Sequence, residues 1–109
     1  MDISIDQIRD VVTDWAYSHR EIECVFLFGS RARGDSTPDS DIDLALVVVG
    51  ILGENADTRY FYNKNVWKDQ LESALGRSIN IVRLIDHGKP EIQASIARDG
   101  VLLYERPSA

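Results

Sequence analysis

One stretch near the middle of the chain restricts its fold and its chemistry more than any other. An apolar run, residues 24–28, leads into Gly29-Ser30, and a polar turn follows. A second apolar run begins at Ile42 and has Asp41 and Asp43 at its start. The pattern predicts a strand, a turn, a short helix, a loop and a second strand. In that arrangement the Gly-Ser backbone lies close to the two carboxylates.

The spacing of the two aspartates has a physical consequence. Asp41 and Asp43 are two residues apart, so on a strand both side chains point to one face of the sheet. Their backbone positions are then roughly 6.6 to 6.8 Å apart. Charges about 6 Å apart repel by roughly 3 kcal/mol at an effective dielectric of about 20. A divalent cation would offset this repulsion, and carboxylate oxygens suit Mg²⁺.

The same residues suggest phosphate chemistry. Two metal ions held by such a pair can clamp the attacking and the leaving oxygen of a phosphoryl-type displacement. The backbone N–H groups of Gly29-Ser30, at the start of a short helix, can bind phosphate. We therefore expect a metal-assisted site for a phosphate compound.

These residues resemble the signature of the minimal nucleotidyltransferases, the smallest members of the DNA polymerase beta superfamily. That signature is Gly-Ser, ten residues, then Asp-x-Asp, and here residues 31–40 separate Gly29-Ser30 from Asp41-Ile42-Asp43. The longer form, Gly-Ser-x-Ala-Arg-Gly and Ser-Asp-x-Asp-Leu, matches at residues 29–34 and 40–44. The match is specific because two separate segments agree in residue type and in spacing.

The resemblance implies an enzyme that binds ATP, with Mg²⁺ on Asp41 and Asp43. An acceptor hydroxyl would attack the α-phosphorus, and pyrophosphate would leave. Gly29-Ser30 would hold the outgoing phosphates. Arg31 or Arg33 would neutralise charge there, or would simply be solvated.

The chain departs from the family at the third carboxylate of the site. By resemblance, a third aspartate lies on a strand that follows the long helix, and the matching position here is Asn80. Asparagine can bind a metal through its carbonyl oxygen, but it cannot accept a proton as a base. Asp86, just past the strand, is a candidate to replace the third carboxylate, although we prefer to interpret it as an ordinary acidic residue of a turn. We therefore expect nucleotide binding with slow or absent transfer.

The family's minimal members lack the second domain with which larger relatives hold a small substrate, and 109 residues leave no length for one. The resemblance thus implies an acceptor on another chain. The best-known case is an antitoxin that transfers AMP to a tyrosine of a HEPN-domain ribonuclease toxin. One alternative is a binding module that neutralises its partner by occlusion alone, which Asn80, the acidic surface and the excess of aromatic residues favour. A drug-modifying nucleotidyltransferase is the third and weakest alternative.

Length and composition limit the remaining function classes. One domain, residues 1–109, is expected, with one modest core. The net charge of −6 argues against stable DNA or RNA binding, which depends on cationic contacts to phosphate. The single cysteine, Cys24, cannot form an internal disulfide and is expected to be buried. No apolar span or signal-peptide pattern indicates a membrane, so a cytoplasmic protein is predicted.

Periodicity predicts the order of the elements. Expected helices cover residues 4–18, 57–75 and 91–98, and expected strands cover residues 23–28, 42–49, 78–84 and 101–104. Ser4 and Gln7 form a capping box before the first helix, and Gly76 stops the second. This order is an α/β sandwich around a mixed four-stranded sheet. It resembles the nucleotidyltransferase catalytic domain over nearly the whole chain.

Several aromatic and histidine residues are expected to be structural. Trp15 and the cluster Tyr60-Phe61-Tyr62 are predicted to lie in the core or on covered surface, with base stacking or partner docking as the alternatives for the cluster. His19 is expected as a solvated residue at a helix end and His87 as a surface-loop residue. The far end of the apolar run 47–52 is a candidate partner contact.

Overall fold

The computed structural model describes residues 2–85 and 90–107. All the predicted elements are present, in the predicted order. They are α1 (Ile5–Tyr17), β1 (Ile22–Phe28), α2 (Ser30–Arg33), β2 (Ile42–Val48), α3 (Ala56–Leu75), β3 (Ile79–Arg83), α4 (Pro90–Asp99) and β4 (Val101–Glu105).

The four strands form one mixed sheet in the order β3-β2-β1-β4. β1 is antiparallel to both β2 and β4, whereas β2 and β3 are parallel. The two strands that flank the Gly-Ser turn are therefore the central pair. The α/β fold predicted from the sequence is confirmed.

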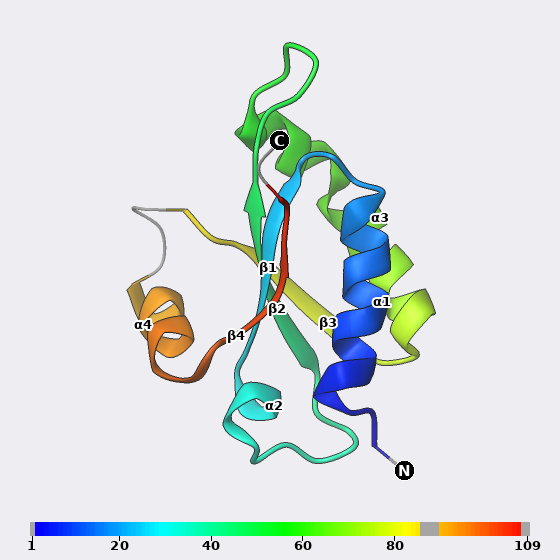
Figure 1. Cartoon of the computed structure of the whole chain (residues 1–109), viewed down its shortest axis with the longest axis vertical. Coiled ribbons are helices and arrows are strands. Elements are labelled where there is room, and N and C mark those ends of the chain that lie inside the picture. The colour runs from blue at the N-terminus through cyan, green and yellow to red at the C-terminus, as the bar shows by residue number, and fades with distance from the viewer. Residues whose placement is uncertain (1, 86–89, 108–109) are drawn as a thin grey trace.

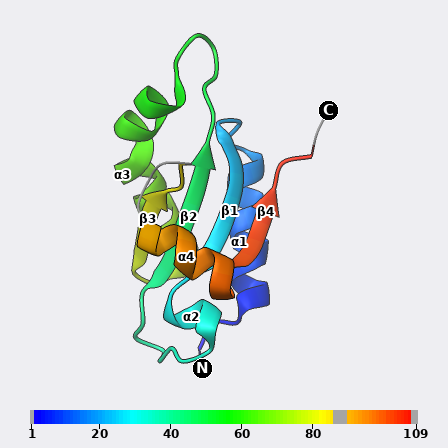
Figure 2. The same ribbon diagram turned by 90° about the vertical axis from the view of Figure 1, so that its left-hand side faces the viewer.

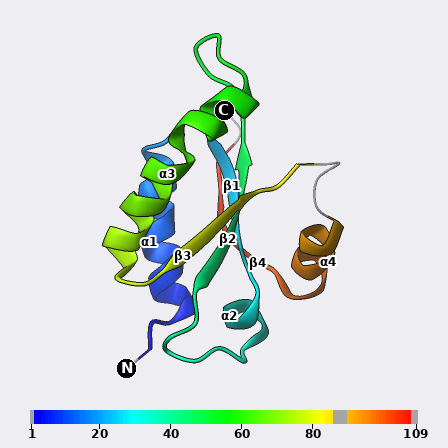
Figure 3. The same ribbon diagram turned by 180° about the vertical axis from the view of Figure 1, so that it is seen from behind.

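Helices α1 and α3 lie on one face of the sheet, and α4 lies on the other (Figure 1). The view from behind shows α3 beside α1, with β3 crossing next to them (Figure 3). The core lies between these two helices and the sheet. Its helical members are Ile8, Val12 and Ala16 of α1 and Trp67, Leu71 and Leu75 of α3.

Local signals in the sequence set the helix ends. The N–H of Gln7 donates to Ser4 Oγ (3.1 Å), and the N–H of Ser4 donates to Gln7 Oε1 (2.8 Å), which confirms the capping box. Gly76 ends α3 in the left-handed conformation, as predicted. α3 begins earlier than expected because Asn55 Oδ1 accepts a hydrogen bond from the N–H of Thr58 and acts as its N-cap.

Two predictions about aromatic and histidine residues were wrong. Phe61 and Tyr62 are 67% and 74% exposed, because Tyr60 and Trp67 turn towards the core and their neighbours on the helix must point elsewhere. His19 is half-buried rather than solvated, since its ring stacks on Trp15 with centroids 4.7 Å apart. Trp15 is structural, as expected.

The end of the sheet remote from the Gly-Ser turn is held by ion pairs. Glu21, just before β1, is buried and pairs with Arg59 of α3 at 2.5 Å. Arg59 also pairs with Glu54, in the turn that follows β2. Leu52, in the same turn, is 93% exposed, and its role as a partner contact stays a prediction.

Three further expectations concern Cys24, the turn at Asp86 and His87, and membrane spans. Cys24 is half-buried rather than fully buried, and desolvation raises the pKa of its thiol, with Glu105 and Glu23 adding to the effect. His87 and Asp86 lie outside the described residues. Within residues 2–85 and 90–107, no helix has the length and apolar character that a bilayer span requires.

Candidate active site

The site is built around a sharp turn at the end of β1. Gly29 is the N-cap of α2 and has φ 77° and ψ −156°, a backbone conformation that residues with a Cβ rarely adopt. A Cβ at this position would overlap Oδ2 of Asp43 and lie 3.1 Å from its Cγ. The turn therefore needs glycine for two reasons, its conformation and its contact with a carboxylate.

Asp43 occupies a central place in the sheet. It pairs with Phe28 of β1 on one side and with Asn80 of β3 on the other. Its neighbours Ile42 and Leu44 point into the core, so the alternation along β2 places Asp43 on the opposite face, where α4 lies. Figure 2 shows α4 crossing in front of this face, with α2 near the end of the sheet at which β2 begins.

Asn80, which the sequence analysis matched to the family's third aspartate, lies beside Asp43. Its Nδ2 donates a hydrogen bond to Asp43 Oδ1 at 3.3 Å. Parallel pairing of β2 with β3 produces this contact, since it sets Asn80 opposite Asp43. An amide hydrogen-bond donor thus faces the carboxylate. Any role of Asn80 in catalysis stays a prediction.

Asp41 precedes the first residue of β2 and is exposed. The loop that precedes β2 holds Asp41, whereas strand pairing on both sides holds Asp43. The negative charge of Asp41 nevertheless reaches Asp43 and raises the pKa of that carboxyl.

The pKa of Asp43 is raised by partial burial, which is the largest effect. The Asn80 hydrogen bond opposes the rise, repulsion by Asp41 adds to it, and the positive charges of Arg33 and Arg31 oppose it. A cation bound here would favour the ionised form of Asp43, because an opposite charge close to a carboxyl lowers its pKa. A bound cation would therefore offset the effects that raise the pKa of Asp43.

The two candidate arginines have different surroundings. Arg33 is exposed, and its Nε donates to Asp35 Oδ2 at 3.3 Å in a surface ion pair. Its charge still acts on Asp43, so its predicted contact with phosphate fits its position.

Arg31 departs from the sequence prediction of phosphate binding. Its side chain is only 3% exposed. All three guanidinium nitrogens donate within the protein, to Asp2 and to the carbonyl groups of Thr37, Pro38 and Ser40. A phosphate group could not reach this guanidinium without displacing those partners, so we propose a structural role for Arg31 instead.

The donor set fits Mg²⁺ bound together with a phosphate compound. Mg²⁺ is commonly held by one or two carboxylates, with substrate phosphates and water as the remaining ligands. Asp41 and Asp43 can supply those carboxylates beside the Gly29 turn. In the described part of the chain, no cluster of three or more His, Cys, Asp or Glu residues could hold a metal without such help.

Sequence reasoning missed one residue of this region. Asp2 pairs with Arg31 at 3.0 Å, although the two are 29 positions apart in the chain. Nothing in the motif indicates such a partner, because an ion pair of this range depends on the tertiary fold. Arg31 needs a counterion because it is buried, but that burial is itself a property of the tertiary fold.

A family model described as "Polymerase beta, Nucleotidyltransferase" matches residues 11–109. No curated protein matches the chain. Several solved structures match it, and three of them are described next.

A toxin-antitoxin crystal structure with AMP-PNP is similar at 20% identity and a TM-score of 0.66, and the match covers 90% of this chain and 73% of that chain. A protein described as a minimal nucleotidyltransferase is similar at 24% identity and a TM-score of 0.62, covering 91% and 95%. A nucleotidyltransferase from Sulfolobus solfataricus is similar at 28% identity and a TM-score of 0.52, covering 90% and 77%.

The first two structures are less than 25% identical to this chain, so their likeness shows the fold alone. The family model covers most of the chain, including the Gly-Ser turn, both aspartates and Asn80. The chain therefore belongs to the polymerase beta nucleotidyltransferase family.

Proposed function

We propose that the chain binds ATP with Mg²⁺ and transfers AMP to a hydroxyl group of a partner protein, a tyrosine of a HEPN-domain toxin. It would then be the antitoxin of a toxin–antitoxin pair. The observation that carries the proposal is the contact between Gly29 and Asp43, which leaves no room for a Cβ. It brings the backbone that would bind phosphate against the carboxylate that would bind the metal.

The chain's own residues divide the work of binding. The Gly29-Ser30 backbone would contact the outgoing phosphates, because successive N–H groups at a tight turn can bind an anion. Asp41 and Asp43 would hold Mg²⁺, whose chemistry here is to neutralise charge on the phosphate oxygens. Arg33 would add positive charge from the exposed side of the turn.

The related structures support a protein partner. One is a toxin–antitoxin complex with AMP-PNP, and others contain the toxin–antitoxin pair MntA-HpeT, including a Y104A mutant. These are properties of those proteins. They support the proposal that this chain also binds a nucleotide and assembles with a second protein.

A second candidate function is neutralisation of the partner by binding alone. Asn80 favours it, since its amide donates to Asp43 and cannot accept the proton of an attacking hydroxyl. Loss of a general base costs about 10² to 10⁴ in rate. Nucleotide binding would be spared, because it depends on the Gly29 turn and the two aspartates.

The two candidates are separated by measuring transfer of labelled AMP. The chain is purified with the product of the neighbouring reading frame and supplied with labelled ATP and saturating Mg²⁺. We expect slow transfer by the wild type and faster transfer by Asn80→Asp, with little change in ATP affinity. Asn65→Asp is the matched control, because it adds the same charge on the exposed surface of α3.

Each outcome has a distinct meaning. An Asn80→Asp variant that binds both ATP and the partner, yet transfers nothing, would favour the occlusion function. Fast wild-type transfer that Asn80→Asp leaves unchanged would assign the base to another residue, with Asp86 the first to examine.

A further inference from the structure

The loop between α2 and Asp41 is held by one buried arginine. Arg31 Nη2 donates to Ser40 O at 2.8 Å, to Pro38 O at 3.3 Å and to Thr37 O at 3.4 Å, and its Nε donates to Ser40 O at 3.2 Å. The turn is closed by the N–H of Ser40, which donates to Thr37 O at 3.0 Å, and by the N–H of Thr37, which donates to Ser40 Oγ at 2.9 Å. Two nitrogens of one guanidinium thus hold the Ser40 carbonyl, and the turn holds the N–H and Oγ of the same residue.

This loop determines where Asp41 lies. Asp41 follows Ser40 directly and precedes the first residue of β2, so sheet pairing does not fix it as it fixes Asp43. The contacts of Arg31 with the Ser40 carbonyl restrain the Asp41 backbone on its N-terminal side, and the N–H of Ile42, which donates to Ser78 O at 2.9 Å, restrains it on the other side. Of these two restraints, only the one from Arg31 belongs to the loop.

Arg31 in turn depends on Asp2. Its Nη1 donates to Asp2 Oδ1 at 3.0 Å and to Oδ2 at 3.1 Å. Within residues 2–85 and 90–107, Asp2 is the only acidic residue in ion-pair contact with Arg31. A guanidinium that is 3% exposed cannot be solvated in place, so it requires this counterion.

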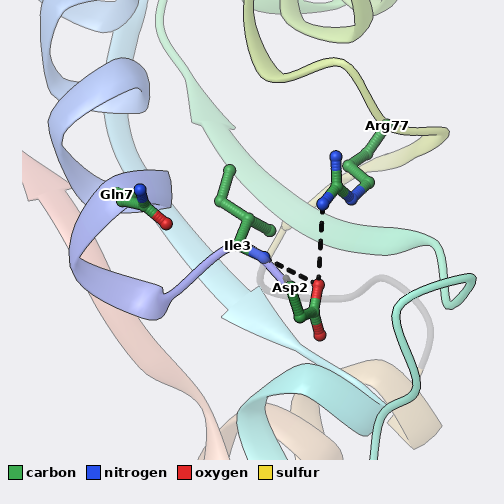
Figure 4. A pocket seen from close by; sticks show the side chains of 4 residues that line it. All are labelled: Asp2, Ile3, Gln7 and Arg77. Carbon is green, nitrogen blue, oxygen red and sulfur yellow. Dashed lines mark hydrogen bonds and ion pairs between the residues drawn. The ribbon is translucent and has the colours of Figure 1, made fainter.

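Asp2 is itself held in place. Its Oδ1 accepts a hydrogen bond from the N–H of Ile3 at 2.8 Å. Arg77 approaches the same oxygen at 3.9 Å, and Figure 4 shows both residues at a pocket of about 270 Å³ that Gln7 also lines. The Arg31 hydrogen bond keeps the pKa of Asp2 below its usual value, so the carboxylate keeps its charge to lower pH than an ordinary aspartate does. Through Arg31, the segment that precedes α1 is thereby connected to the loop between α2 and Asp41.

We infer that Asp2 is a positioning residue of the nucleotide site, which holds Asp41 in place for metal binding through Arg31 and the Ser40 carbonyl. The inference rests on the proposed function. It assigns a role in the site to a residue that lies outside the motif and touches neither the metal nor the nucleotide.

The first test measures the loop without any ligand. Amide hydrogen exchange is followed in the wild type and in Asp2→Ala, each with any purification tag on the C-terminus. We expect exchange at Thr37 and Ser40 to be about tenfold faster in the variant, because charged hydrogen bonds that restrain the loop are lost. The β2 amides should be unchanged. Equal protection of Thr37 and Ser40 in both proteins would overturn the inference.

The second test measures affinity for Mg²⁺ with a non-hydrolysable ATP analogue by titration calorimetry. Asp2→Ala should weaken binding by about tenfold, the lower end of the range for residues that orient metal ligands. Asp2→Glu, which keeps the charge, should recover part of the affinity. Asp6→Ala is the matched control, because it removes the same charge from an exposed pair with Arg9.

A third variant separates positioning from general loss of stability. Glu21→Gln breaks the buried pair with Arg59 at the remote end of the sheet, so it should lower stability while leaving affinity unchanged. Affinity in Asp2→Ala equal to the wild type, or a loss in Glu21→Gln as large as in Asp2→Ala, would overturn the inference. A wild type that binds no Mg-nucleotide would instead refute the proposed function, and the exchange measurement would still decide whether Asp2 holds the loop.

Discussion

Among single residues, Gly29 has the strictest requirement, because its conformation and its contact with Asp43 both exclude a side chain. Gly29→Ala should lower the stability of the fold and abolish Mg-nucleotide binding, since the new Cβ must displace the Asp43 carboxylate. Thermal unfolding and nucleotide titration of the same samples would measure both effects.

Gly76→Ala is the matched control for this substitution. Gly76 also has a positive φ, of 66°, but a Cβ there would meet nothing within 4 Å. The left-handed conformation should cost about 1 to 2 kcal/mol, and nucleotide binding should persist. The account would be contradicted if Gly29→Ala bound nucleotide as Gly76→Ala does.

The titration of Asp43 offers a second test at this scale. Its folded-state pKa lies above the ordinary value of 3.8, so its carboxyl stays protonated at pH values where an ordinary aspartate is ionised. The resulting contribution to stability is present below 3.8 and is lost as the pH rises through the folded-state pKa. Metal affinity has the opposite dependence, because Mg²⁺ needs the ionised form.

Asn80→Ala should raise the pKa of Asp43 further, since it removes a hydrogen bond that favours the charged form. Carbon NMR of the Asp43 carboxyl in the unliganded protein would follow the titration. Asn65→Ala, on the exposed surface of α3, should leave the midpoint unchanged. An Asp43 midpoint at or below 3.8, or one that Asn80→Ala lowers, would refute this description of the site.

Residues of the site could be predicted from the sequence where their placement is local. The Gly29-Ser30 turn and the Asp41-x-Asp43 pair follow from short-range patterns, and Asn80 follows from element order and family resemblance. The roles of Arg31 and Asp2 could not be predicted, because burial of Arg31 depends on a segment 29 positions away. A motif arginine looks the same in sequence whether it binds a phosphate or a carbonyl.

At the scale of elements, helix α3 shows why the existence of a helix is easier to predict than the exposure of its individual residues. Its apolar residues at positions 67, 71 and 75 are buried, so periodicity identified the helix and its core face. The helix begins at Ala56, one residue before the predicted start, because the Asn55 cap lies outside the apolar pattern. The exposed Phe61 and Tyr62 were misjudged because residue type alone does not state which way a helical position points.

The same helix provides a stability test. Leu71→Ala should destabilise the fold by about 2 to 5 kcal/mol, because Leu71 is fully buried between α3 and the sheet. Val66→Ala on the same helix should change stability by less than about 0.5 kcal/mol, since Val66 is 52% exposed. Urea denaturation measures both. Equal losses would mean that α3 does not pack as described.

At the scale of the whole molecule, the candidate site and a cluster of stabilising ion pairs lie at opposite ends of the sheet. The candidate site lies where β1 ends and β2 begins, and the Glu21–Arg59–Glu54 ion pairs lie at the other end. The exposed side chains of Phe61, Tyr62 and Leu52 remain available for the partner that the proposed function requires. The positions of these two regions at opposite ends of the sheet could not be predicted from a sequence pattern. Each region is formed by segments that are distant in the chain and meet only in the fold.

The central claim is that Asp41 and Asp43 bind Mg²⁺ with ATP, and thermal unfolding tests it most directly. A ligand that binds only the folded state stabilises it by about 2.7 kcal/mol at a hundred times its dissociation constant. The wild type should show a Mg²⁺-dependent rise in melting temperature with ATP. Asp10→Ala with Asp14→Ala, which removes two exposed charges from α1, should retain it. Asp41→Ala with Asp43→Ala should lose the rise, and a full Mg²⁺-dependent rise in that double variant would contradict the account.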